Sequence, residues 1–372
     1  MKYKLIHGKE LDAALIARWL QIRDGSTQDQ NSSQNQAQST YQSPYYHPTF
    51  TQIAAGIRDD TRIVVCEDAG QIVGVLPFHR LSKYQARSVG LFLADYQGPI
   101  TENGIQLSPK TLLQAMGVRY MGFDHMPQSR TDFKPYAWAH SRSQVLDLEG
   151  GFEVYADKLA LLQNVKQAGV LKTIKQMERK VAREKGELRF TMQSTSDHDF
   201  AQLLQGKSEQ FNRTLGEGHD TFAIPWVRQM LDSLRAHDSS DFGGLLSTLH
   251  VGDELVAAHF GLRSGGVLHF WFPWYRVDYA VYSVGLILLK ECASHAQSLG
   301  ISSIDLGRGE QAYKTRFATS SVALCEGAIA NPDLIRQARI SYLRTRWAVR
   351  DSWLGHKLKA LKSAAKTSKQ SD

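Results

Sequence analysis

Three candidate acid–base side chains gather between residues 254 and 317 of the chain. His259 lies in a run that alternates like a strand, and its imidazole titrates near neutral pH, as a general base requires. Asp305 ends a short apolar run, and Glu310 follows it in a glycine-rich corner. Burial would raise the pKa of the Asp305 carboxyl toward that of a base, whereas a salt bridge with Arg308 would make it structural. A strand histidine can equally be a buried structural donor.

The elements that must position these residues follow from periodicity. Residues 254–263 alternate along a strand, residues 264–266 predict a tight turn, and residues 267–273 return as an aromatic strand. The two faces of the first strand are Val256, Ala258, Phe260 and Leu262 on one side, and Ala257, His259, Gly261 and Arg263 on the other. A helix follows from Ser283, a preferred N-cap residue, to a stop at Gly300. A strand over 301–306 and a helical piece over 311–318 complete the segment.

The start of the helix at Ser283 predicts an anion site. Free backbone N–H groups and the helix dipole both favour negative charge there. The words Asp-Leu-Gly-Arg-Gly-Glu place titratable groups at the carboxyl edge of a sheet, where ligands bind in open α/β sheets. Lys314 could add a point charge for a phosphate. Trp271, Trp274 and Tyr275 would either form a hydrophobic rim or stack on a sugar ring.

Several sequence words in this region resemble a known family. They are Val-Ala-Ala-His-Phe-Gly-Leu-Arg, Trp-Phe-Pro-Trp-Tyr, Tyr-Ser-Val-Gly, Asp-Leu-Gly-Arg-Gly and Ala-Tyr-Lys. Together they resemble the GNAT-type acyltransferase domain of the CelD-like family, which is associated with bacterial cellulose and exopolysaccharide. The resemblance is specific over about residues 165–330 and looser over 40–150. It implies transfer of an acyl group from acyl-CoA to an amine or hydroxyl acceptor.

The resemblance also implies roles for single residues. Tyr313 stands where GNAT enzymes often place a tyrosine that protonates the departing thiolate, although a tyrosine here could simply pack. The implied catalytic set is His259, Asp305, Glu310 and Tyr313. The implied acyl-CoA contacts are Tyr275, Tyr282, Ser283, Val284, Gly285 and Lys314. The implied acceptor contacts are Trp271, Trp274, Arg308, Lys207 and Gln210. Backbone N–H groups near 272–274 would polarise the thioester carbonyl.

The chain departs from the common GNAT pattern at one place. The usual Gln/Arg-x-x-Gly-x-Gly/Ala pyrophosphate loop is absent, and only Tyr282-Ser-Val-Gly285 precedes the helix. A small loop and a helix N-terminus can still hold a pyrophosphate. Acetyl-CoA or another acyl-CoA is therefore the favoured donor, and an aminoacyl-tRNA donor stays open.

Composition bounds the class of protein. A chain of 372 residues fits two domains, and 42% hydrophobic with 22% charged residues is ordinary for a soluble protein. No apolar run approaches the ~20 residues needed to span a bilayer, and the N-terminus lacks a long apolar stretch. The cysteines, Cys66, Cys292 and Cys325, predict a reducing compartment and no metal site. We expect a cytoplasmic protein, at most peripheral at the inner face of the membrane, with no DNA partner.

The order of elements predicts a duplication. Residues 44–127 repeat the helix, hairpin, strand, helix and strand seen over 245–310. We expect an α/β (α+β) fold of two tandem GNAT-like units, each a mixed, mostly antiparallel sheet flanked by helices, which also resembles FemAB-type transferases. The expected units are 1–143 and 144–331. The Gln/Ser-rich stretch 24–42 is expected to be a disordered insertion, since it cannot bury enough surface to order itself.

Other elements of the two units are read from the same patterns. Predicted strands are 2–6, 62–67, 72–81, 90–93, 120–127 and 245–250. Predicted helices are 10–23, 49–57, 107–116, 170–185, 203–213 and 224–234. The helix over 170–185 is strongly basic, with an apolar face that packs. Its charges either form a solvated face between domains or one wall of a groove for an anionic substrate.

The C-terminal segment 332–372 holds ten Lys and Arg residues and three Asp residues. Its net charge is therefore +7, which equals the formal net charge of the whole chain. A helix is predicted over 334–353. It either docks on the second unit or binds anions, and the expected ligands are an anionic membrane surface or a phosphorylated nucleotide. The anion-binding candidates are Arg336, Arg339, Arg344 and Arg346.

The resemblance to the CelD-like family implies an N-acetyltransferase that acts on an amino sugar or another saccharide acceptor, including a nucleotide sugar, in exopolysaccharide biosynthesis. One alternative is a FemAB-like transferase that uses aminoacyl-tRNA. Another is a non-catalytic scaffold or nucleotide-sensing protein of a polysaccharide machine.

Overall fold

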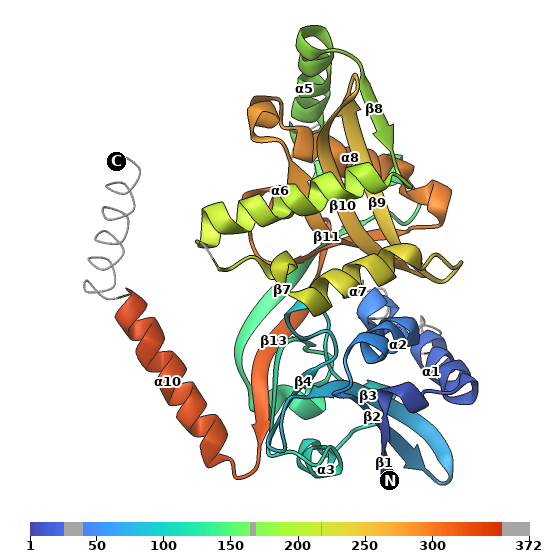
Figure 1. Ribbon diagram of the computed structural model, residues 1–372, viewed down its shortest axis with the longest axis vertical. Coiled ribbons are helices and arrows are strands. Elements are labelled where there is room, and N and C mark those ends of the chain that lie inside the picture. Colours follow the sequence, from blue (N-terminus) through green and yellow to red (C-terminus); the bar gives the residue numbers. More distant parts are fainter. Residues whose placement is uncertain (26–39, 164–168, 217, 352–372) are drawn as a thin grey trace.

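The computed structural model of the chain describes residues 1–25, 40–163, 169–216 and 218–351 (Figure 1). Side chains are described in these ranges except at 40, 215 and 346–351. The expected insertion 24–42 falls mostly outside the description. Its ends are ordered, because residues 24–25 finish a helix and Thr40–Gln42 form a 3-10 turn.

The first unit contains strands β1 (Lys2–His7), β2 (Thr61–Asp68), β3 (Gln71–Arg80), β4 (Gln85–Ser88), β5 (Ile100–Thr101), β6 (Tyr120–Pro127) and β7 (Ala137–Asp147). Its helices are α1 (Ala13–Gly25), α2 (Pro48–Ile57) and α3 (Pro109–Ala115). Helices α2 and α3 each begin with a proline in the first turn and a side-chain cap. The cap is His47 in α2 and Ser108 in α3.

The second unit contains strands β8 (Leu188–Thr191), β9 (Phe242–Val251), β10 (Glu254–Ser264), β11 (Val267–Tyr275), β12 (Ser303–Arg308) and β13 (Ser320–Ala330). Its helices are α4 (Phe152–Leu162), α5 (Gly169–Lys185), α6 (Asp197–Leu215), α7 (Pro225–Ala236), α8 (Val284–His295) and α9 (Ala312–Phe317). The helix α10 (Leu334–Asp351) follows β13 and lies beside the first unit in Figure 1.

One sheet passes through both units in the order β1-β2-β3-β4-β6-β13-β7-β12-β11-β10-β9-β8, with β5 beside β3. The order is symmetric about its centre, and each half has one parallel pair, β4 with β6 and β11 with β12. The last strands are exchanged: β7 of the first unit pairs with β12, and β13 of the second unit pairs with β6. Figure 1 shows β7 and β13 running together between the two halves. The expected duplicated α/β fold is confirmed.

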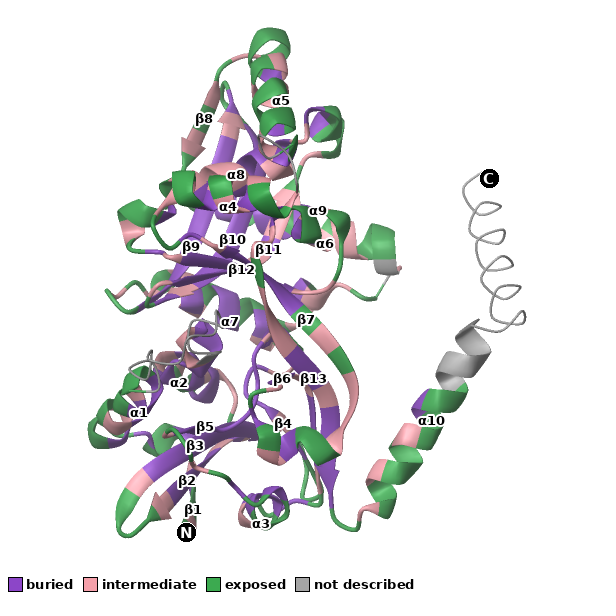
Figure 2. Ribbon diagram, turned by 180° about the vertical axis from the view of Figure 1, so that it is seen from behind, coloured by how far each residue is buried: buried purple, intermediate pink, exposed green. Residues whose placement is uncertain are grey.

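The sheet is buried on both faces. One core fills the space between the two units and includes Trp19, Phe50, Phe242 and Phe260. A second core packs α5 and α8 on the sheet of the second unit, and a third packs α3 on the first. Figure 2 shows the strands as the buried centre and α10 as mostly exposed. The chain therefore has a rigid sheet on which a site can be built.

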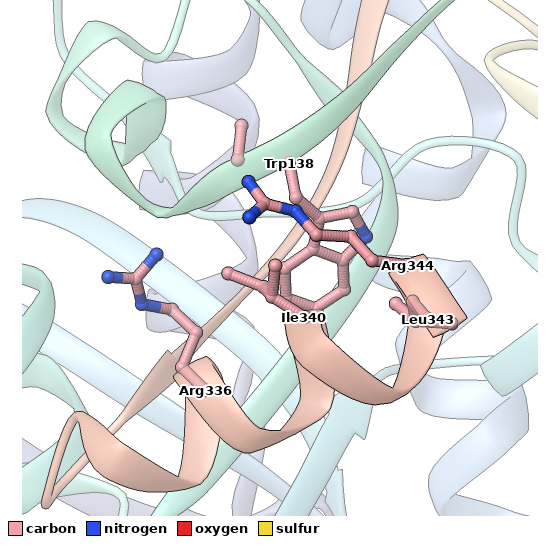
Figure 3. A pocket seen from close by; sticks show the side chains of 6 residues that line it. Trp138, Arg336, Ile340, Leu343 and Arg344 are labelled. Atoms are coloured by element: carbon pink, nitrogen blue, oxygen red, sulfur yellow. The ribbon is translucent and has the colours of Figure 1, made fainter. Parts of the chain in front are cut away.

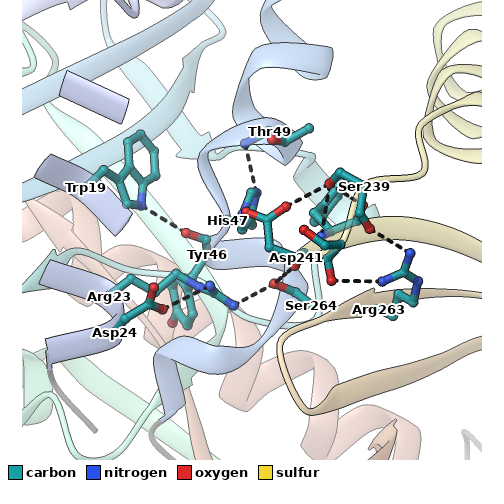
Figure 4. Close-up of polar contacts among 12 residues, drawn as sticks. Trp19, Arg23, Asp24, Tyr46, His47, Thr49, Ser239, Asp241, Arg263 and Ser264 are labelled. Carbon is teal, nitrogen blue, oxygen red and sulfur yellow. Dashed lines mark hydrogen bonds and ion pairs between the residues drawn. The ribbon is translucent and has the colours of Figure 1, made fainter. Parts of the chain in front are cut away.

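A polar contact joins the two units at the edge of the central core (Figure 4). The Arg23 guanidinium donates to the hydroxyl of Ser264 at 2.6 Å, and the Ser264 hydroxyl donates to the Asp241 carbonyl at 2.9 Å. The His47 Nε2 lies 3.2 Å from the Asp241 Oδ2. Helix α1 and the start of α2 are thus fixed to the β9–β10 region of the second unit. The expected boundary at 143/144 falls inside β7, and the division at that point stays a prediction.

Most predicted elements are confirmed to within a few residues, and three details are wrong. Residues 90–93 are not a strand, because Gly90 and Leu91 have φ of 79° and 53° and lead into a 3-10 turn. Ser283 occupies the N-cap of α8 with φ 55°, and its side chain makes no capping hydrogen bond. Val256 packs in the α8 core with Ala257, because a bulge between Leu255 and Ala257 shifts the alternation.

Candidate active site

The parallel strands β11 and β12 separate at one point. Their register pairs Val267 with Ser303, Leu268 with Ile304 and His269 with Asp305. Beyond His269, β11 continues to Tyr275 on β10 alone, while β12 continues beside β7. Pro273, which has no N–H to donate to a neighbouring strand, lies in the part of β11 that pairs with β10 but not with β12. The sheet therefore opens immediately after the His269–Asp305 pair.

A β-bulge marks the same point. The β10–β11 register shifts between Phe260 and Leu262, opposite the residues that follow His269. A Cβ on Gly261 would lie 2.2 Å from the His269 carbonyl oxygen, so only glycine fits there. Bulges bend a strand and increase its local twist. The bulge is the local reason why β11 turns away from β12.

The helix α8 begins beside this opening. Tyr275, the last residue of β11, lies over Gly285, with its Cδ1 3.1 Å from where a Cβ would stand. Ser283 is left-handed, which turns the chain into the helix, and Val284 is fully buried. The hydroxyl of Tyr282 donates to Glu184 of α5 at 3.1 Å. Five of the six residues expected to contact the acyl donor are thus gathered at the N-terminus of α8.

The basic face of α5 lies beside that N-terminus. Val170, Ile174 and Val181 are buried against α8, which confirms the expected packing face. The ammonium of Lys180 lies 5.4 Å from the ring centre of Tyr282, and that of Lys185 lies 6.0 Å from the ring centre of Tyr279. Positive charge on α5 and the free end of α8 both favour an anion at this place.

Asp305 is buried at the carboxyl edge of β12, with three donors around its carboxylate. Tyr96 donates to Oδ2 at 2.5 Å, Ser143 donates to Oδ1 at 2.5 Å, and the backbone N–H of Gly307 donates to Oδ1 at 2.8 Å. Tyr96 and Ser143 belong to the first unit. The salt bridge between Asp305 and Arg308, which was one of the two alternatives for Asp305, is not formed. The Arg308 guanidinium lies 3.5 Å from Glu326 instead.

His269 links Asp305 to a second carboxylate. Its Nε2 lies 2.9 Å from the Asp95 Oδ2, and its Nδ1 faces the Asp305 Oδ1 at 3.7 Å. His125 reaches the other oxygen of Asp95 at 3.6 Å and contacts Asp124 at 3.0 Å. The His269 side chain is 1% exposed, whereas that of Asp95 is 25% exposed. Asp95 is therefore the carboxylate of this cluster that meets solvent.

The pKa of Asp95 reflects two opposing effects. Burial works to raise it, but the hydrogen bond and charge of His269 outweigh burial and hold the pKa below its usual value. Asp95 is therefore ionised at neutral pH and suited to bind a cation. The cluster consists of Asp95, His125, His269 and Asp305, and we call it the junction cluster, because its members come from both units.

The expected base His259 lies inside the protein. It is fully buried and stacks on Phe270 with ring centres 3.9 Å apart. Burial lowers its pKa to about 3. Neither ring nitrogen has a hydrogen-bond partner among the described residues. An acceptor cannot reach this imidazole in the observed conformation, so the geometry favours a packing role.

The remaining catalytic candidates lie on α9 and before it. Glu310 is exposed, whereas Tyr313 is partly buried against the α8 core. Burial raises the pKa of Tyr313 to about 12, which keeps its hydroxyl protonated. Lys314 is buried, and its ammonium donates to the carbonyls of Gly307 and Arg308 at 3.3 and 2.9 Å. Lys314 thus braces the glycine-rich corner and does not join the α8 N-terminus.

The expected acceptor residues meet on α6 and β11. The indole of Trp274 lies on Gly206, where a Cβ would be 2.0 Å from its Nε1. The neighbouring Lys207 donates to Gln210 at 3.0 Å, and burial lowers the pKa of its ammonium to about 8. Trp271 stacks on Phe272. Arg308 lies apart from this group, since its guanidinium donates to the Asp124 carbonyl at 3.0 Å and lies 3.5 Å from Glu326.

The arginines of the C-terminal helix border two clefts against the first unit. One, of about 370 Å³, is lined by Ala137, Trp138, Arg336, Ile340, Leu343 and Arg344 (Figure 3). Arg336 is paired with Asp333 at 2.7 Å. Arg339 borders a second cleft. The side chain of Arg346 lies outside the described residues.

Several residues of the site were not found from the sequence, namely Asp95, Tyr96, His125, Ser143 and His269. His269 lies two residues before Trp271 on β11, so the two side chains are expected on the same face of the strand. This spacing is the sequence feature that could have placed His269 near the site. Within the described ranges, no group of three or more His, Cys, Asp or Glu side chains is arranged to hold a metal ion. No helix in those ranges is long and apolar enough to cross a membrane.

The comparisons with known proteins identify a domain family in one part of the chain and similar folds over most of it. Residues 168–315 match the acetyltransferase (GNAT) domain family, so this part of the chain is a GNAT-type domain. The protein is an acyltransferase, and the tandem GNAT-like fold expected from the sequence is confirmed. No match was found among curated proteins.

Solved structures resemble the chain over most of its length. The C-terminal domain of a putative lysylphosphatidylglycerol synthetase from Agrobacterium fabrum is 13% identical, with a TM-score of 0.50, and the match covers 87% of this chain and 96% of that one. A tandem GNAT protein from the clavulanic acid biosynthesis pathway is 10% identical, with a TM-score of 0.49 and coverage of 88% and 98%. FemX is 10% identical, with a TM-score of 0.47 and coverage of 74% and 89%. At 13% identity the likeness to the Agrobacterium fabrum domain shows the fold alone.

Proposed function

We propose that the protein transfers an acetyl or other acyl group from acyl-CoA to the amine of a saccharide acceptor. The observation that carries the proposal is the opening between β11 and β12, which lies between the N-terminus of α8 and the junction cluster. A donor bound at α8 and an amine bound at the cluster would meet in this opening. Placing two reactants together removes much of the entropic cost of their reaction.

The donor is held by its phosphates. Backbone N–H groups at the start of α8 bind the diphosphate, and Lys180 and Lys185 of α5 add positive charge. Tyr275 packs over Gly285 and borders the path of the pantetheine arm. The unpaired backbone of β11 beyond His269 supplies N–H groups that polarise the thioester carbonyl.

The acceptor is held as a cation. An ionised carboxylate with a lowered pKa is a weak base but a good partner for an ammonium group, so Asp95 binds the protonated amine. The proton passes to His125, which is 15% exposed, and from there to solvent. The neutral amine attacks the thioester carbon, and the nitrogen then loses its second proton to solvent. The carbon–sulfur bond breaks, and Tyr313 protonates the leaving thiolate and regains a proton from solvent. Asp305 acts as a positioning residue, because it faces His269 and anchors Gly307.

An amino sugar fits the aromatic border of the opening. Trp271 and Trp274 of β11 are each partly exposed, and the part that is not packed on Phe272 or on Gly206 is available to contact a sugar ring. The resemblance to the CelD-like family supports a saccharide acceptor in exopolysaccharide biosynthesis at the inner face of the membrane.

The proposal is tested by assaying the release of free CoA thiol from acetyl-CoA with glucosamine as acceptor and glucose as its matched control. We expect release that requires the amine and falls roughly 10²- to 10⁴-fold in Asp95→Ala, the range for a lost acid–base group. The proposal fails if no amine supports thiol release above the rate without acceptor.

An aminoacyl-tRNA donor is a second candidate, and the basic face of α5 favours it. Lys172, Lys175, Arg179 and Arg183 are exposed there, and they could bind a nucleic-acid backbone. Aminoacyl transfer that requires charged tRNA and is unaffected by CoA would replace the first proposal with this one.

A further inference from the structure

A basic cleft lies between α10 and the first unit, apart from the opening of β11 and β12. It has a volume of about 510 Å³, which is within the range of small-molecule sites. Its lining residues are Tyr84, Gln85, Arg87, Arg119, Tyr120, Ile335 and Arg339. They come from β4, from the start of β6 and from α10, so three separate segments of the chain meet at this cleft.

Within the described residues, the three guanidinium groups of the cleft make no ion-pair contact, and Arg87 acts on the Asp124 carboxylate only as a more distant charge behind that of His125. Across the part of the chain that the structure describes, no ion pair joins Arg87, Arg119 or Arg339 to an acidic side chain. The nearest acidic groups are engaged elsewhere: Asp124 contacts His125 at 3.0 Å, and Glu326 accepts from the Trp138 indole at 3.2 Å and lies 3.5 Å from Arg308.

The backbone around the cleft holds these arginines in place. The N–H groups of Arg119 and Tyr120 both donate to the Tyr84 carbonyl at 2.9 Å, which ties the start of β4 to the start of β6. A Cβ on Gly122 would lie 3.2 Å from the Tyr120 hydroxyl and 3.3 Å from the Arg87 guanidinium. The glycine therefore leaves room for both side chains to lie across the strand. The Arg119 guanidinium stacks over the Tyr84 ring at 5.5 Å.

This chemistry selects a phosphorylated ligand. Guanidinium groups bind phosphate oxygens in pairs, with a geometry that a lysine cannot offer. A single phosphate ester carries about −1.5 to −2 charge near neutral pH, so three arginines match a diphosphate better than a monophosphate. The tyrosine rings beside them offer a surface for the sugar or base of such a ligand.

We propose that the cleft of Arg87, Arg119 and Arg339 is a binding site for a diphosphate ester, distinct from the acyl-donor site at α8. The diphosphate belongs either to a soluble nucleotide or to a lipid headgroup. A bound diphosphate would add a contact between α10 and the first unit through Arg339, beside the direct contact that Arg336 makes with the Tyr136 ring.

The test is calorimetric titration of the full-length protein with uridine diphosphate and with inorganic pyrophosphate at low salt. Co-sedimentation with phosphatidylcholine vesicles that contain a polyprenyl diphosphate is the lipid arm, and vesicles that contain phosphatidylglycerol, a monophosphate, are its control. The variants are Arg87→Gln and Arg119→Gln. The matched control is Arg189→Gln, because Arg189 is an exposed strand arginine on β8 at the opposite end of the same sheet. Melting temperatures of the free variants check that each is folded.

We expect uridine diphosphate to bind and each cleft variant to weaken it by about tenfold or more, as the loss of a charged hydrogen bond predicts, while Arg189→Gln binds like the wild type. Vesicle binding that is lost in the same two variants, without uridine diphosphate binding, assigns the phosphates to a lipid. The proposal is overturned if neither ligand binds, or if both cleft variants bind as tightly as the control. Repeating the titration with saturating CoA separates this site from the donor site.

Discussion

The Nε2 of His269 lies 2.9 Å from the Oδ2 of Asp95, and this contact joins the β11 strand of the second unit to a loop of the first. Ser143 and Tyr96, also from the first unit, donate to Asp305. The carboxyl edge of the second unit is therefore completed by the first. The duplication is thus more than a repeat of one fold, because neither unit contains the whole junction cluster.

The dependence on Asp95 can be tested by substitution. We expect Asp95→Asn to lower kcat roughly 10²-fold or more, because the neutral amide no longer holds the ammonium group beside His125, which takes its proton. The matched control is Asp68→Asn in the β2–β3 hairpin, where the carboxylate pairs with the N-terminus 3.2 Å away. Steady-state rates of thiol release with acetyl-CoA give the comparison. Equal rates in both variants would remove Asp95 from the mechanism.

Asp305→Asn and Tyr313→Phe are expected to lower turnover by roughly ten- to ten-thousand-fold with the fold kept. In Asp305→Asn, an amide group replaces one of two oxygens that accept from Tyr96, Ser143 and Gly307, so His269 is no longer positioned. Tyr313→Phe removes the proton donor to the thiolate. Tyr342→Phe is the control, since Tyr342 is exposed on α10. Circular dichroism and rate measurements check both parts. Full activity in both folded variants would place the active site elsewhere.

Gly206→Ala tests how closely Trp274 packs on α6. A Cβ at this position would stand 2.0 Å from the indole Nε1, so the ring must move. We expect the free energy of unfolding to fall by about 1–3 kcal/mol, the usual cost of overpacking. In Gly56→Ala of α2 nothing lies within 4 Å of the new Cβ, and stability should rise slightly through helix propensity. Chemical denaturation measures both. A loss of stability no larger in Gly206→Ala than in Gly56→Ala would contradict the packing.

The buried imidazole of His259 predicts a dependence of stability on pH. Its pKa of about 3 in the folded protein lies below the ordinary value of 6.5, so the unfolded chain binds a proton first as pH falls. Stability from this group is complete above pH ~6.5 and is lost progressively toward pH ~3. Between pH 7 and pH 5 the loss is on the order of 2 kcal/mol.

His259→Asn removes this titration, so we expect its stability to change less between pH 7 and pH 5 than that of the wild type. Phe270→Leu disturbs the same stacked pair without removing a titrating group, and it should lose stability by a similar amount at both pH values. Denaturation curves at the two pH values provide the test. An unchanged pH dependence in His259→Asn would show that the imidazole is already hydrated in the folded state.

The sequence predicted the elements well because their periods and turn residues are local. The strand 120–127, the helix 170–185 and the stop at Gly300 follow from patterns within a few residues, and the structure confirms each of them. The α8 N-terminus was found for the same reason. Ser283 is the N-cap as predicted, but its side chain makes no capping hydrogen bond, because the residue takes a left-handed conformation.

The junction cluster could not be predicted, because its members are brought together by strand exchange. His269 and Asp95 are 174 residues apart, and Ser143 meets Asp305 only since β7 pairs with β12. The prediction of a strand over 90–93 also gave Asp95 the wrong position. Residues 90 and 91 have positive φ angles and form a turn, and Asp95 follows this turn. His259 was predicted to be a base from its residue type. The alternation within one strand does not reveal that both faces of the sheet are covered there, so the burial of His259 could not be predicted.

The most direct test of the account is calorimetric titration of the full-length protein with acetyl-CoA, comparing the wild type with Gly285→Asp at the start of α8. We predict saturable binding by the wild type and a loss of roughly tenfold or more in the variant, because the new carboxylate repels the diphosphate. Gly56→Asp on α2 is the control and should bind like the wild type, since its side chain meets nothing within 4 Å. No saturable heat at millimolar acetyl-CoA, or equal affinity in all three proteins, would contradict a donor site at α8.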